Sequence, residues 1–570
     1  MKKYFLMGLF FFSLVSCQRE IDKYYEIPDW LKGNAYEVME DRGNFSIFMK
    51  AVDRSSYASL VKGKGIVTVM APTDDAFSAY LTKHNYGSVE DISQTELDKL
   101  IGYHLIYYSY TKQNFMFYNP NGIDAELENP GTYFKFRTKS RDAISTVKDY
   151  ANGGVIRKIM HKDRFIPVIS NYSLSGWSSS PKDEYEKMFP GSTYGGGTNN
   201  FNISNAGIVG DEIVTDNGYL YVVDQVLEPL ETLYTEMSHE GSEYTKFAAM
   251  YDRFVKYEYD EDATADYGNG DSLFVHSHYS LPSIACEWTN LSEYSIPDYA
   301  QLNYLSSISF TVLAPDNAAI DEFYRKYWAN SFSSLEEVNY VPLYYFMSAH
   351  AGEYRGKMMT STALSAIINM EDRYDGTTIT EPDYVKVCTN GILGGMKGNV
   401  ITPEPFESPM APALCNKDYN IFALIAHRGG LISKIQSINE TQFNIFFPSD
   451  DMLKRTEYNG DFIQYLKGNP YIINDEQIQV ANAEDGTLGN LNTTQAQEIA
   501  GAHVMDNVLS TRNGGTEIIY SSYNDFEYLY RVNDEIYSSA TWNSKALGNE
   551  VSVPTAKLIK EVRCRKLINL

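Results

Sequence analysis

The sequence contains few cysteines, and none of them stands close to another. Only five of its 570 residues are cysteine. Because no C-x-x-C pair occurs, neither a zinc ribbon nor a thioredoxin-like redox site is indicated. Four cysteines lie beyond the N-terminal region, and they allow three disulfide pairings among which the sequence does not choose. These four are Cys286, Cys388, Cys415 and Cys564.

Positive charge is also scarce. The chain has 48 Lys and Arg residues against 74 Asp and Glu residues, which gives a formal net charge of −26. Nucleic acids and anionic lipid headgroups are polyanions, so this balance argues against both as partners. An acidic surface also keeps a secreted protein soluble, and this simpler explanation carries most of the weight.

The motifs of common enzyme classes are missing. The sequence has no G-x-S-x-G, no H-E-x-x-H and no G-x-x-x-x-G-K, which are patterns of hydrolases, zinc proteases and P-loop proteins. The pairs Asp74-Asp75 and Asp450-Asp451 resemble the two carboxylates of a glycosidase. Both pairs stand at expected helix starts, where acidic residues serve as caps. We therefore predict no catalytic residues, no cofactor and no enzyme activity.

One acidic stretch, residues 260–266, suggests calcium because its oxygen ligands are closely spaced. It has Ala265 where a calcium loop needs glycine at the sixth position, and no glutamate at the twelfth. The stretch is therefore predicted to be a solvated loop, and no metal site is expected.

Only the N-terminus carries a long apolar run. Lys2 and Lys3 precede the 12 apolar residues 4–15, which are followed by Ser16 and Cys17. A membrane-spanning helix needs about 20 such residues, so the run is predicted to be a cleaved signal peptide, residues 1–16. Residues 14–17 resemble a bacterial lipoprotein processing box, which implies that Cys17 carries lipid. Residues 17–33 would then form the tether.

Three strings of residues recur in the same order along the chain, at 68–77, 311–320 and 444–453. Each predicts a short buried strand that ends at a proline, followed by a helix. Thr73, Asp316 and Ser449 fall at the N-cap of that helix, where a side-chain oxygen can accept from backbone N–H groups.

Further elements accompany the strings. A helix carrying a histidine follows each one, with His104, His350 and His503 at matching places. The first two copies then close on Asn217-Gly218 and Asn390-Gly391 between apolar runs. Asn-Gly in this setting predicts a β-hairpin with a type I′ turn, in which both central residues have positive φ.

This order of elements resembles a fasciclin domain, a mixed α/β module of adhesion proteins. The resemblance implies an α+β fold of three tandem modules, each a β-sheet or wedge packed with helices. Their expected ranges are residues 34–230, 231–407 and 408–570, the last being the most divergent. Module one has an insertion at about 110–202, rich in tyrosine and glycine, and such long insertions are usually functional or disordered.

Candidate contact residues come from two places. Tyr103-His104 resembles the pair implicated in adhesion by animal fasciclin proteins, but a histidine that recurs in three copies favours a structural role. Trp177, Tyr185 and Tyr194 stand in the insertion, and exposed aromatic rings stack on sugars and anchor protein interfaces. We expect a partner or ligand to bind there.

The whole chain resembles surface lipoproteins of Bacteroides-type bacteria that accompany SusCD-type nutrient importers. That resemblance implies a non-catalytic accessory subunit, anchored by lipid in the outer membrane and exposed at the cell surface. Its partners would be a TonB-dependent transporter with its lid lipoprotein, and its cargo a glycan or peptide. An adhesin and a stand-alone glycan-binding protein are the alternatives, and they differ in the class of ligand bound.

Overall fold

The computed structural model describes residues 33–116, 134–174, 180–197, 199–288, 308–355, 384–436, 444–454, 457–458, 461–469, 471–481, 485–505, 516–520, 528–532, 535–538 and 556–557. Within these ranges, no helix is both long and apolar enough to cross a membrane. Cys17, Trp177 and Cys564 lie outside the described residues.

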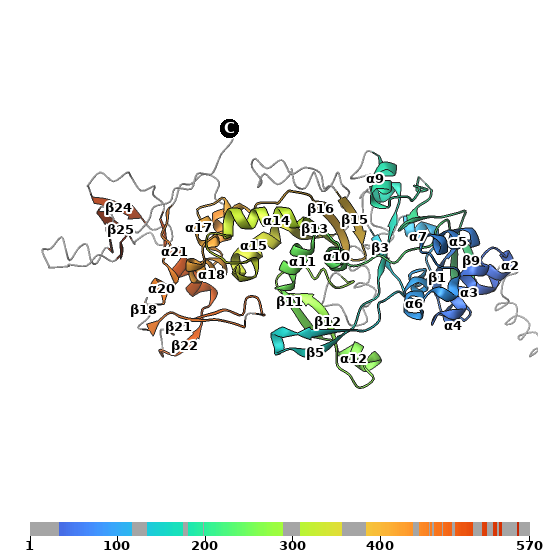
Figure 1. Ribbon diagram of the computed structural model, residues 1–570, viewed down its shortest axis with the longest axis horizontal. Coiled ribbons are helices and arrows are strands. Elements are labelled where there is room, and N and C mark those ends of the chain that lie inside the picture. Colours follow the sequence, from blue (N-terminus) through green and yellow to red (C-terminus); the bar gives the residue numbers. More distant parts are fainter. Residues whose placement is uncertain are drawn as a thin grey trace, which may run out of the picture. The chain divides into compact units, whose positions relative to one another are not determined.

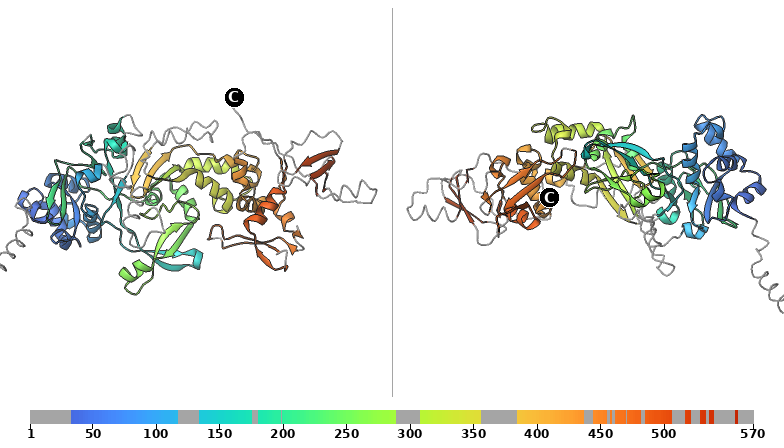
Figure 2. Two further views of the ribbon diagram at one scale, coloured as in Figure 1. Left: turned by 180° about the vertical axis from the view of Figure 1, so that it is seen from behind. Right: turned by 90° about the horizontal axis from the view of Figure 1, so that it is seen from below.

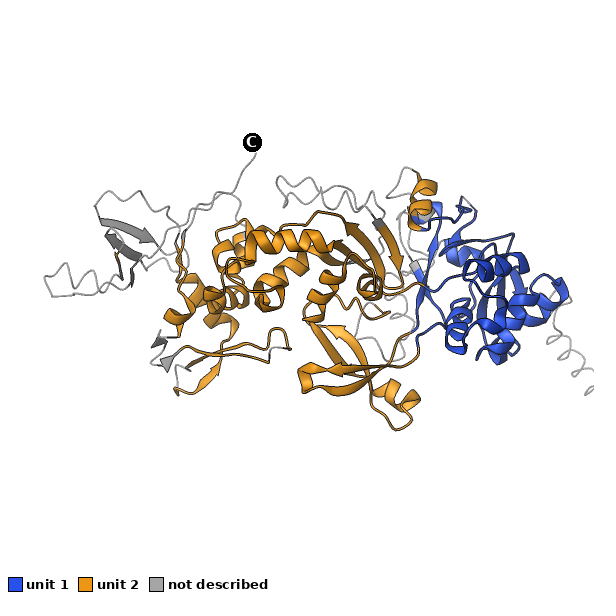
Figure 3. Ribbon diagram, in the orientation of Figure 1, with its two compact units in different colours: residues 1–142, 163–173, 189–229 blue, residues 143–162, 174–188, 230–570 orange. Residues whose placement is uncertain are grey.

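The chain forms two compact units (Figure 3). Unit 1 comprises residues 1–142, 163–173 and 189–229, and unit 2 comprises 143–162, 174–188 and 230–570. The insertion predicted at about 110–202 is therefore divided, because two of its segments belong to unit 2. We describe each unit separately.

Unit 1 is built on a four-stranded sheet in the order β2-β1-β10-β9 (Figure 1). Strand β1 (Val67–Pro72) pairs in parallel with β10 (Gly218–Val223), whereas β2 (Leu105–Tyr107) and β9 (Ile213–Thr215) pair antiparallel at the two edges. All six residues of β1 are buried. The string at 68–77 thus forms the strand and proline stop that its residues predict.

Five α-helices pack with this sheet: α2 (Ala35–Arg42), α3 (Ser46–Arg54), α4 (Ala58–Val61), α5 (Asp74–Lys83) and α6 (Gln94–Tyr103). Phe48 of α3, Phe77 of α5 and Ile101 of α6 are each fully buried in one apolar cluster with β1. The helical stripe predicted around Phe48 therefore faces the core, as three- and four-residue spacing requires.

The rest of unit 1 comes from the insertion and its flanks. A second sheet has the order β3-β6-β7-β8, and all its pairs are antiparallel. Its strands are β3 (Phe134–Arg137), β6 (Phe165–Ile169), β7 (Asn202–Ile203) and β8 (Ala206–Gly207). Two short helices, α7 (Lys112–Met116) and α8 (Asn171–Leu174), precede β3 and follow β6.

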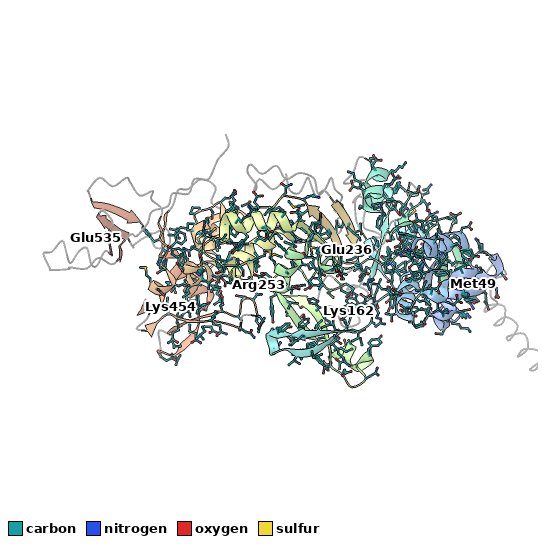
Figure 4. The ribbon with its side chains drawn as sticks, in the orientation of Figure 1. Met49, Lys162, Glu236, Arg253, Lys454 and Glu535 are labelled. Atoms are coloured by element: carbon teal, nitrogen blue, oxygen red, sulfur yellow. The ribbon has the colours of Figure 1, made fainter. Side chains whose placement is uncertain are left out.

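Unit 2 contains a sheet with the same topology as the β2-β1-β10-β9 sheet of unit 1. Its strands follow the order β14-β13-β16-β15, again with one central parallel pair and two antiparallel edges. They are β13 (Ile308–Pro315), β14 (Ala351–Arg355), β15 (Tyr384–Cys388) and β16 (Gly391–Met396). The accompanying helices are α10 (Leu233–Ser238), α11 (Thr245–Asp252), α14 (Asn317–Phe323) and α15 (Tyr340–His350). Glu236 of α10, labelled in Figure 4, forms an ion pair of 2.8 Å with Lys386 of β15.

Unit 2 also holds a mixed sheet in the order β11-β12-β5-β4, whose green and teal strands are seen in the left view of Figure 2. Strands β11 (Val255–Tyr259) and β12 (Leu273–His278) belong to the second predicted module. The hairpin of β4 (Ser145–Asp149) and β5 (Val155–Ile159) comes from the insertion, and β5 pairs in parallel with β12. Helix α9 (Pro181–Met188) is a second insertion segment of this unit.

The acidic stretch at 260–266 is not a solvated loop throughout, so that prediction is wrong. Helix α12 (Glu261–Tyr267) begins there, and the Asp260 carboxylate caps it by accepting from the Ala263 N–H at 2.9 Å. Asp260 also forms an ion pair with Lys162, which is labelled in Figure 4. N-capping by aspartate favours a helix over the loop that charge alone suggests.

The C-terminal part of unit 2 keeps less of the sheet. Among its described residues, β17 (Asn444–Ile445) pairs antiparallel with β23 (Val504–Met505). Its helices are α17 (Ala411–Leu414), α18 (Asn420–Arg428), α19 (Leu431–Gln436), α20 (Asp450–Leu453) and α21 (Thr493–Gly501). Its other strands are β18 (Glu457–Tyr458), β19 (Asp461–Phe462), β20 (Gln464–Leu466), β21 (Gln477–Ala481), β22 (Leu488–Asn490), β24 (Thr516–Tyr520), β25 (Tyr528–Val532), β26 (Glu535–Ser538) and β27 (Ala556–Lys557). One apolar cluster runs from Leu233 to Val504, so the second and third predicted modules share a core.

The three predicted N-caps are confirmed. Thr73 accepts from the Ala76 N–H at 3.3 Å, Asp316 from the Ala319 N–H at 2.8 Å, and Ser449 from the Met452 N–H at 3.3 Å. The mixed α+β fold class is likewise confirmed by the sheets and helices of both units.

The two Asn-Gly hairpins form, but the predicted type I′ turns are wrong. Thr215 pairs with Gly218, and Cys388 pairs with Gly391. The two-residue loops are therefore 216–217 and 389–390, and each glycine is the first residue of the strand that follows. Positive φ is absent at the loop residues 216–217 and 389–390. Both glycines instead stand in the strand, where the neighbouring backbone leaves no room for a Cβ.

The asparagines of the two hairpins have one shared structural role. Asn217 accepts from the Ala35 N–H at 2.9 Å, at the start of α2, and donates to the Val61 carbonyl at 3.1 Å. Asn390 accepts from the Leu233 N–H at 3.0 Å, at the start of α10. Both side chains are buried, so each ties a hairpin to the first helix of its module.

Replacing Asn217 with alanine should therefore destabilise unit 1 by about 2–3 kcal/mol, because it leaves a buried N–H and a buried carbonyl without partners. Pulse proteolysis of the full chain in urea would measure the loss. Asn199→Ala, at an exposed position of the same unit, is the control and should change stability by less than about 0.5 kcal/mol. Equal effects of the two variants would contradict the assigned role.

Candidate functional site

Tyr103 and His104, which the resemblance singles out, are both fully buried at the end of α6. The Tyr103 hydroxyl donates to the Phe165 carbonyl at 3.3 Å. The Lys139 N–H donates to the carbonyls of Gly102 and Leu105, at 3.0 and 2.9 Å, so the strap of residues 138–140 covers this helix end. Insertion segments therefore enclose the pair, and a ligand has no direct access to it.

The hydrogen bonds of His104 set its tautomer. The Leu227 N–H donates to Nε2 at 3.2 Å, so Nε2 is unprotonated, and Nδ1–H donates to the Met70 carbonyl at 2.7 Å. Burial lowers the pKa of His104 to about 4, although the bond to Met70 favours the charged form. The ring is thus a neutral bridge between β1, α6 and the segment after β10.

Histidines recur at the matching places in unit 2, but their Nδ1 atoms lie beside a helix carbonyl four residues earlier and not beside a strand. His350 Nδ1 lies 2.7 Å from the Phe346 carbonyl, and its Nε2 accepts from the Ile401 N–H at 3.1 Å. His503 Nδ1 lies 2.7 Å from the Ile499 carbonyl. This recurrence agrees with the structural role that the sequence favours for these histidines.

The aromatic candidates of the insertion have separate environments. Tyr185 lies on α9 in unit 2 and is fully buried. Tyr194, in unit 1, is partly exposed, and its hydroxyl donates to Asn171 Oδ1 at 2.5 Å. Burial raises the pKa of Tyr194 to about 12. Tyr194 is thus the one aromatic candidate of the described insertion with a face open to solvent.

A different group of insertion residues gathers around a buried carboxylate in unit 1. We call Tyr107, Arg137, Lys139, Arg141 and Asp163 the Asp163 cluster. The Asp163 carboxylate accepts from the Tyr107 hydroxyl at 2.9 Å and from Arg137 Nη2 at 2.6 Å, and lies 3.4 Å from Arg141 Nε. Lys139 Nζ lies 3.2 Å from the centre of the Tyr107 ring. Two arginines therefore share one carboxylate, and a third cation lies over the tyrosine that donates to it.

A second ion-pair group extends the positive charge. Asp142 Oδ2 accepts from Arg164 at 2.6 Å, and its Oδ1 lies 2.9 Å from Lys99 Nζ. Burial raises the pKa of Asp142, but the two cations outweigh it and hold that pKa at about 2. Together the two groups hold more cations than carboxylates, on a chain whose net charge is strongly negative.

Lys139 has a perturbed pKa. Burial lowers it to about 8, while Asp163 acts to raise it and Arg137 and Arg141 each act to lower it. The side chains of Arg137, Lys139 and Arg141 are all partly exposed. A local positive potential with reachable guanidinium groups can bind a carboxylate, sulfate or phosphate of a partner.

The Asp163 cluster is not apparent from the overall composition, because the net charge of the chain is negative. The sequence does contain a pattern that indicates the cations of the cluster. Lysines and arginines alternate with uncharged residues at Lys135, Arg137, Lys139 and Arg141. A period of two places these cations on one side of an extended segment. Asp163 could not be found this way, since β6 and β3 meet only in the folded sheet.

The lowered pKa of Lys139 predicts selective reactivity. At pH 8 about half of its amine should be neutral, so an amine-acylating reagent should modify Lys139 well before the exposed Lys64. Peptide mass spectrometry after brief labelling would compare the two sites. Arg141→Gln should slow labelling of Lys139 by raising its pKa, while equal labelling of Lys64 and Lys139 would contradict the electrostatic account.

Comparison with known proteins identifies one type of domain in the chain. A solved FAS1 domain pair from the insect cell adhesion molecule fasciclin I is similar over 64% of this chain and 98% of its own, with 12% identity and a TM-score of 0.22. No curated protein matches the sequence. The model of the Fasciclin domain matches residues 43–159, so the chain carries a Fasciclin domain, a type of domain associated with adhesion and binding.

Proposed function

We propose that this protein is a non-catalytic, lipid-anchored binding protein of the outer membrane that serves a SusCD-type nutrient importer. One observation carries the binding role. A Fasciclin domain, a type associated with adhesion, bears an insertion that builds a basic and aromatic cluster on a chain of net charge −26. An acidic group of the partner or of the cargo would bind at the Asp163 cluster.

The anchor and its location are the first part of the proposal. Cys17 would carry the lipid, and the body would face the outside of the cell. Protease treatment of intact cells tests this, with a periplasmic protein as control. Loss of the protein supports surface exposure, whereas protection equal to that of the control would reject it. A Cys17→Ala variant should be released from membranes.

The partner is the second part. Crosslinking of intact membranes followed by purification should recover a TonB-dependent transporter and its lid lipoprotein. The double variant Lys139→Gln, Arg141→Gln should reduce that recovery, since it removes two partly exposed cations. The matched control is Arg42→Gln, Lys64→Gln, at exposed positions of the same unit. Failure to recover any transporter would reject the importer role.

Adhesion is the second candidate function, because Fasciclin domains are associated with it. An adhesin would bind immobilised matrix proteins or neighbouring cells without any transporter. A stand-alone glycan-binding protein would bind soluble oligosaccharides and lose them on Trp177→Ala or Tyr194→Ala. Binding assays with these two ligand classes therefore separate the alternatives from the importer role.

A further inference from the structure

Unit 2 contains a cluster of aromatic and histidine side chains apart from the insertion's basic residues. His276 and His278 stand two positions apart on β12, so their side chains share one face of the strand. Tyr257 of β11 is the strand partner of His276. Tyr234 of α10 and Tyr251 of α11 pack against the histidines. We call these five residues the β12 histidine cluster.

The rings in this cluster are closely packed. The centres of the His276 and His278 rings lie 5.3 Å apart, with an angle of 38° between their planes. Tyr251 meets His278 edge-on at 4.9 Å, and Tyr234 meets His276 edge-on at 5.2 Å. Tyr257 lies 5.4 Å from His276. The two imidazoles are thus held beside each other within an aromatic wall.

Four polar atoms of this cluster are buried without a hydrogen-bond partner among the described residues. They are His276 Nε2, both ring nitrogens of His278, and the Tyr251 hydroxyl. His278 is 3% exposed and Tyr251 is fully buried. Buried polar groups are nearly always paired, and leaving one unpaired costs about 1–3 kcal/mol. Four such atoms in one cluster indicate that something other than the chain binds them.

Both imidazoles are suited to bind as neutral ligands. A neutral imidazole carries one ring nitrogen with a free lone pair, which can bind a metal ion. Lys256 does not exclude a cation, because its Nζ lies 2.6 Å from a Glu258 carboxylate oxygen, which offsets its charge.

We propose that His276 and His278 form a binding site for one divalent first-row transition-metal ion of the zinc class, with the Tyr251 hydroxyl beside it. Two imidazoles on one tetrahedral ion, with Zn–N distances of about 2.0 Å, have ring centres roughly 5 Å apart, as these rings do. Imidazole nitrogen suits Zn²⁺, Cu²⁺ and Ni²⁺, whereas Ca²⁺ and Mg²⁺ require oxygen ligands.

Such an ion would link parts of unit 2. It would hold β12 through two ligands and lie beside α11 through Tyr251, so its binding energy would stabilise the packing of the sheet on the helices. This role is independent of the importer proposal, because the cluster contains none of the residues proposed to contact a partner.

The full chain, freed of metal by chelation, tests the site. Titration with Zn²⁺ by calorimetry should show a site that binds one ion per chain, and Zn²⁺ should raise the melting temperature. His276→Asn and His278→Gln should each weaken this binding at least tenfold, whereas His239→Asn, at an exposed position of unit 2, should not. Binding that both cluster variants leave intact would overturn the proposal, as would the absence of stoichiometric binding.

A second measurement uses the unmodified chain and therefore does not require that any variant folds. Co²⁺ bound to the unmodified chain should give an X-ray absorption spectrum with scattering from two imidazole rings. A spectrum with oxygen ligands alone would place the ion elsewhere and reject the site. Buried waters would then be the partners of the four polar atoms.

Discussion

Gly218→Ala should destabilise unit 1 by more than about 3 kcal/mol. Losses of this size are usual only where a substitution strains the backbone or overpacks the core. Gly218 has φ +139°, a conformation that side chains rarely adopt, and it pairs with Val67 of β1. A Cβ there would overlap the Val67 carbonyl oxygen and lie 3.0 Å from its carbonyl carbon. Because these are backbone atoms of a buried strand, they cannot move aside without breaking the sheet.

Gly210→Ala is the matched control. Gly210 also has positive φ, at +80°, but no atom lies within 4 Å of the added Cβ. Its substitution should cost only about 1–2 kcal/mol of backbone strain. Pulse proteolysis in urea would compare the two variants in the full chain. If they lose equal stability, close approach of β1 to β10 is not what requires glycine at position 218.

Acidification should destabilise both units through their buried histidines. Burial lowers the pKa of His104, His350 and His276 to about 4 in the folded chain, whereas an unfolded histidine titrates near 6.5. The unfolded state therefore binds more protons between these values. Each histidine contributes stability that is complete above about pH 6.5 and is lost as pH falls through 4, on the order of 3 kcal/mol per residue.

Some carboxyl groups act in the opposite sense. Burial raises the pKa of Asp450 to about 6, so the folded chain gains stability there as pH falls through that value. Because burial or partial burial lowers the pKa of several histidines in unit 2, we expect the histidines to dominate. The net result should be a loss of stability in unit 2 between pH 6.5 and pH 4.

Hydrogen exchange at two pH values would locate the effect. After correction for intrinsic exchange, the amides of Leu227 and Ile401, which donate to His104 and His350, should lose protection at pH 5 relative to pH 7. His350→Gln should remove most of this pH dependence at Ile401. His239→Asn, at an exposed position, should change neither amide. Protection that stays constant with pH would show that these histidines do not control acid stability.

Local features of the fold follow directly from the residues. Thr73, Asp316 and Ser449 cap the helices that the sequence predicts. Capping depends on a side chain and a backbone N–H three residues away, so a short stretch of sequence is enough to predict it. The parallel pairing of β1 with β10 is repeated by β13 and β16, in agreement with the repeated strings.

The candidate site was less predictable. Tyr103, which the family resemblance singles out, and Tyr185, which aromatic chemistry proposes as a contact, are both buried. Chemistry alone does not distinguish a ligand-stacking ring from a core ring. The Asp163 cluster required the return of β6 beside β3. In the same way, only the packing of α10 and α11 against β12 surrounds His276 and His278 with aromatic rings.

The sequence by itself determined the repeated order of strand, cap and helix, the histidine after each string and the glycine at each hairpin, because these features depend on near neighbours along the chain. It also predicts the lipid anchor at Cys17. The tertiary structure alone decided that the insertion is shared between two units, that the second and third modules share a core, and which side chains are buried. Those outcomes depend on contacts between residues far apart in the chain, and a local sequence pattern does not reveal such contacts.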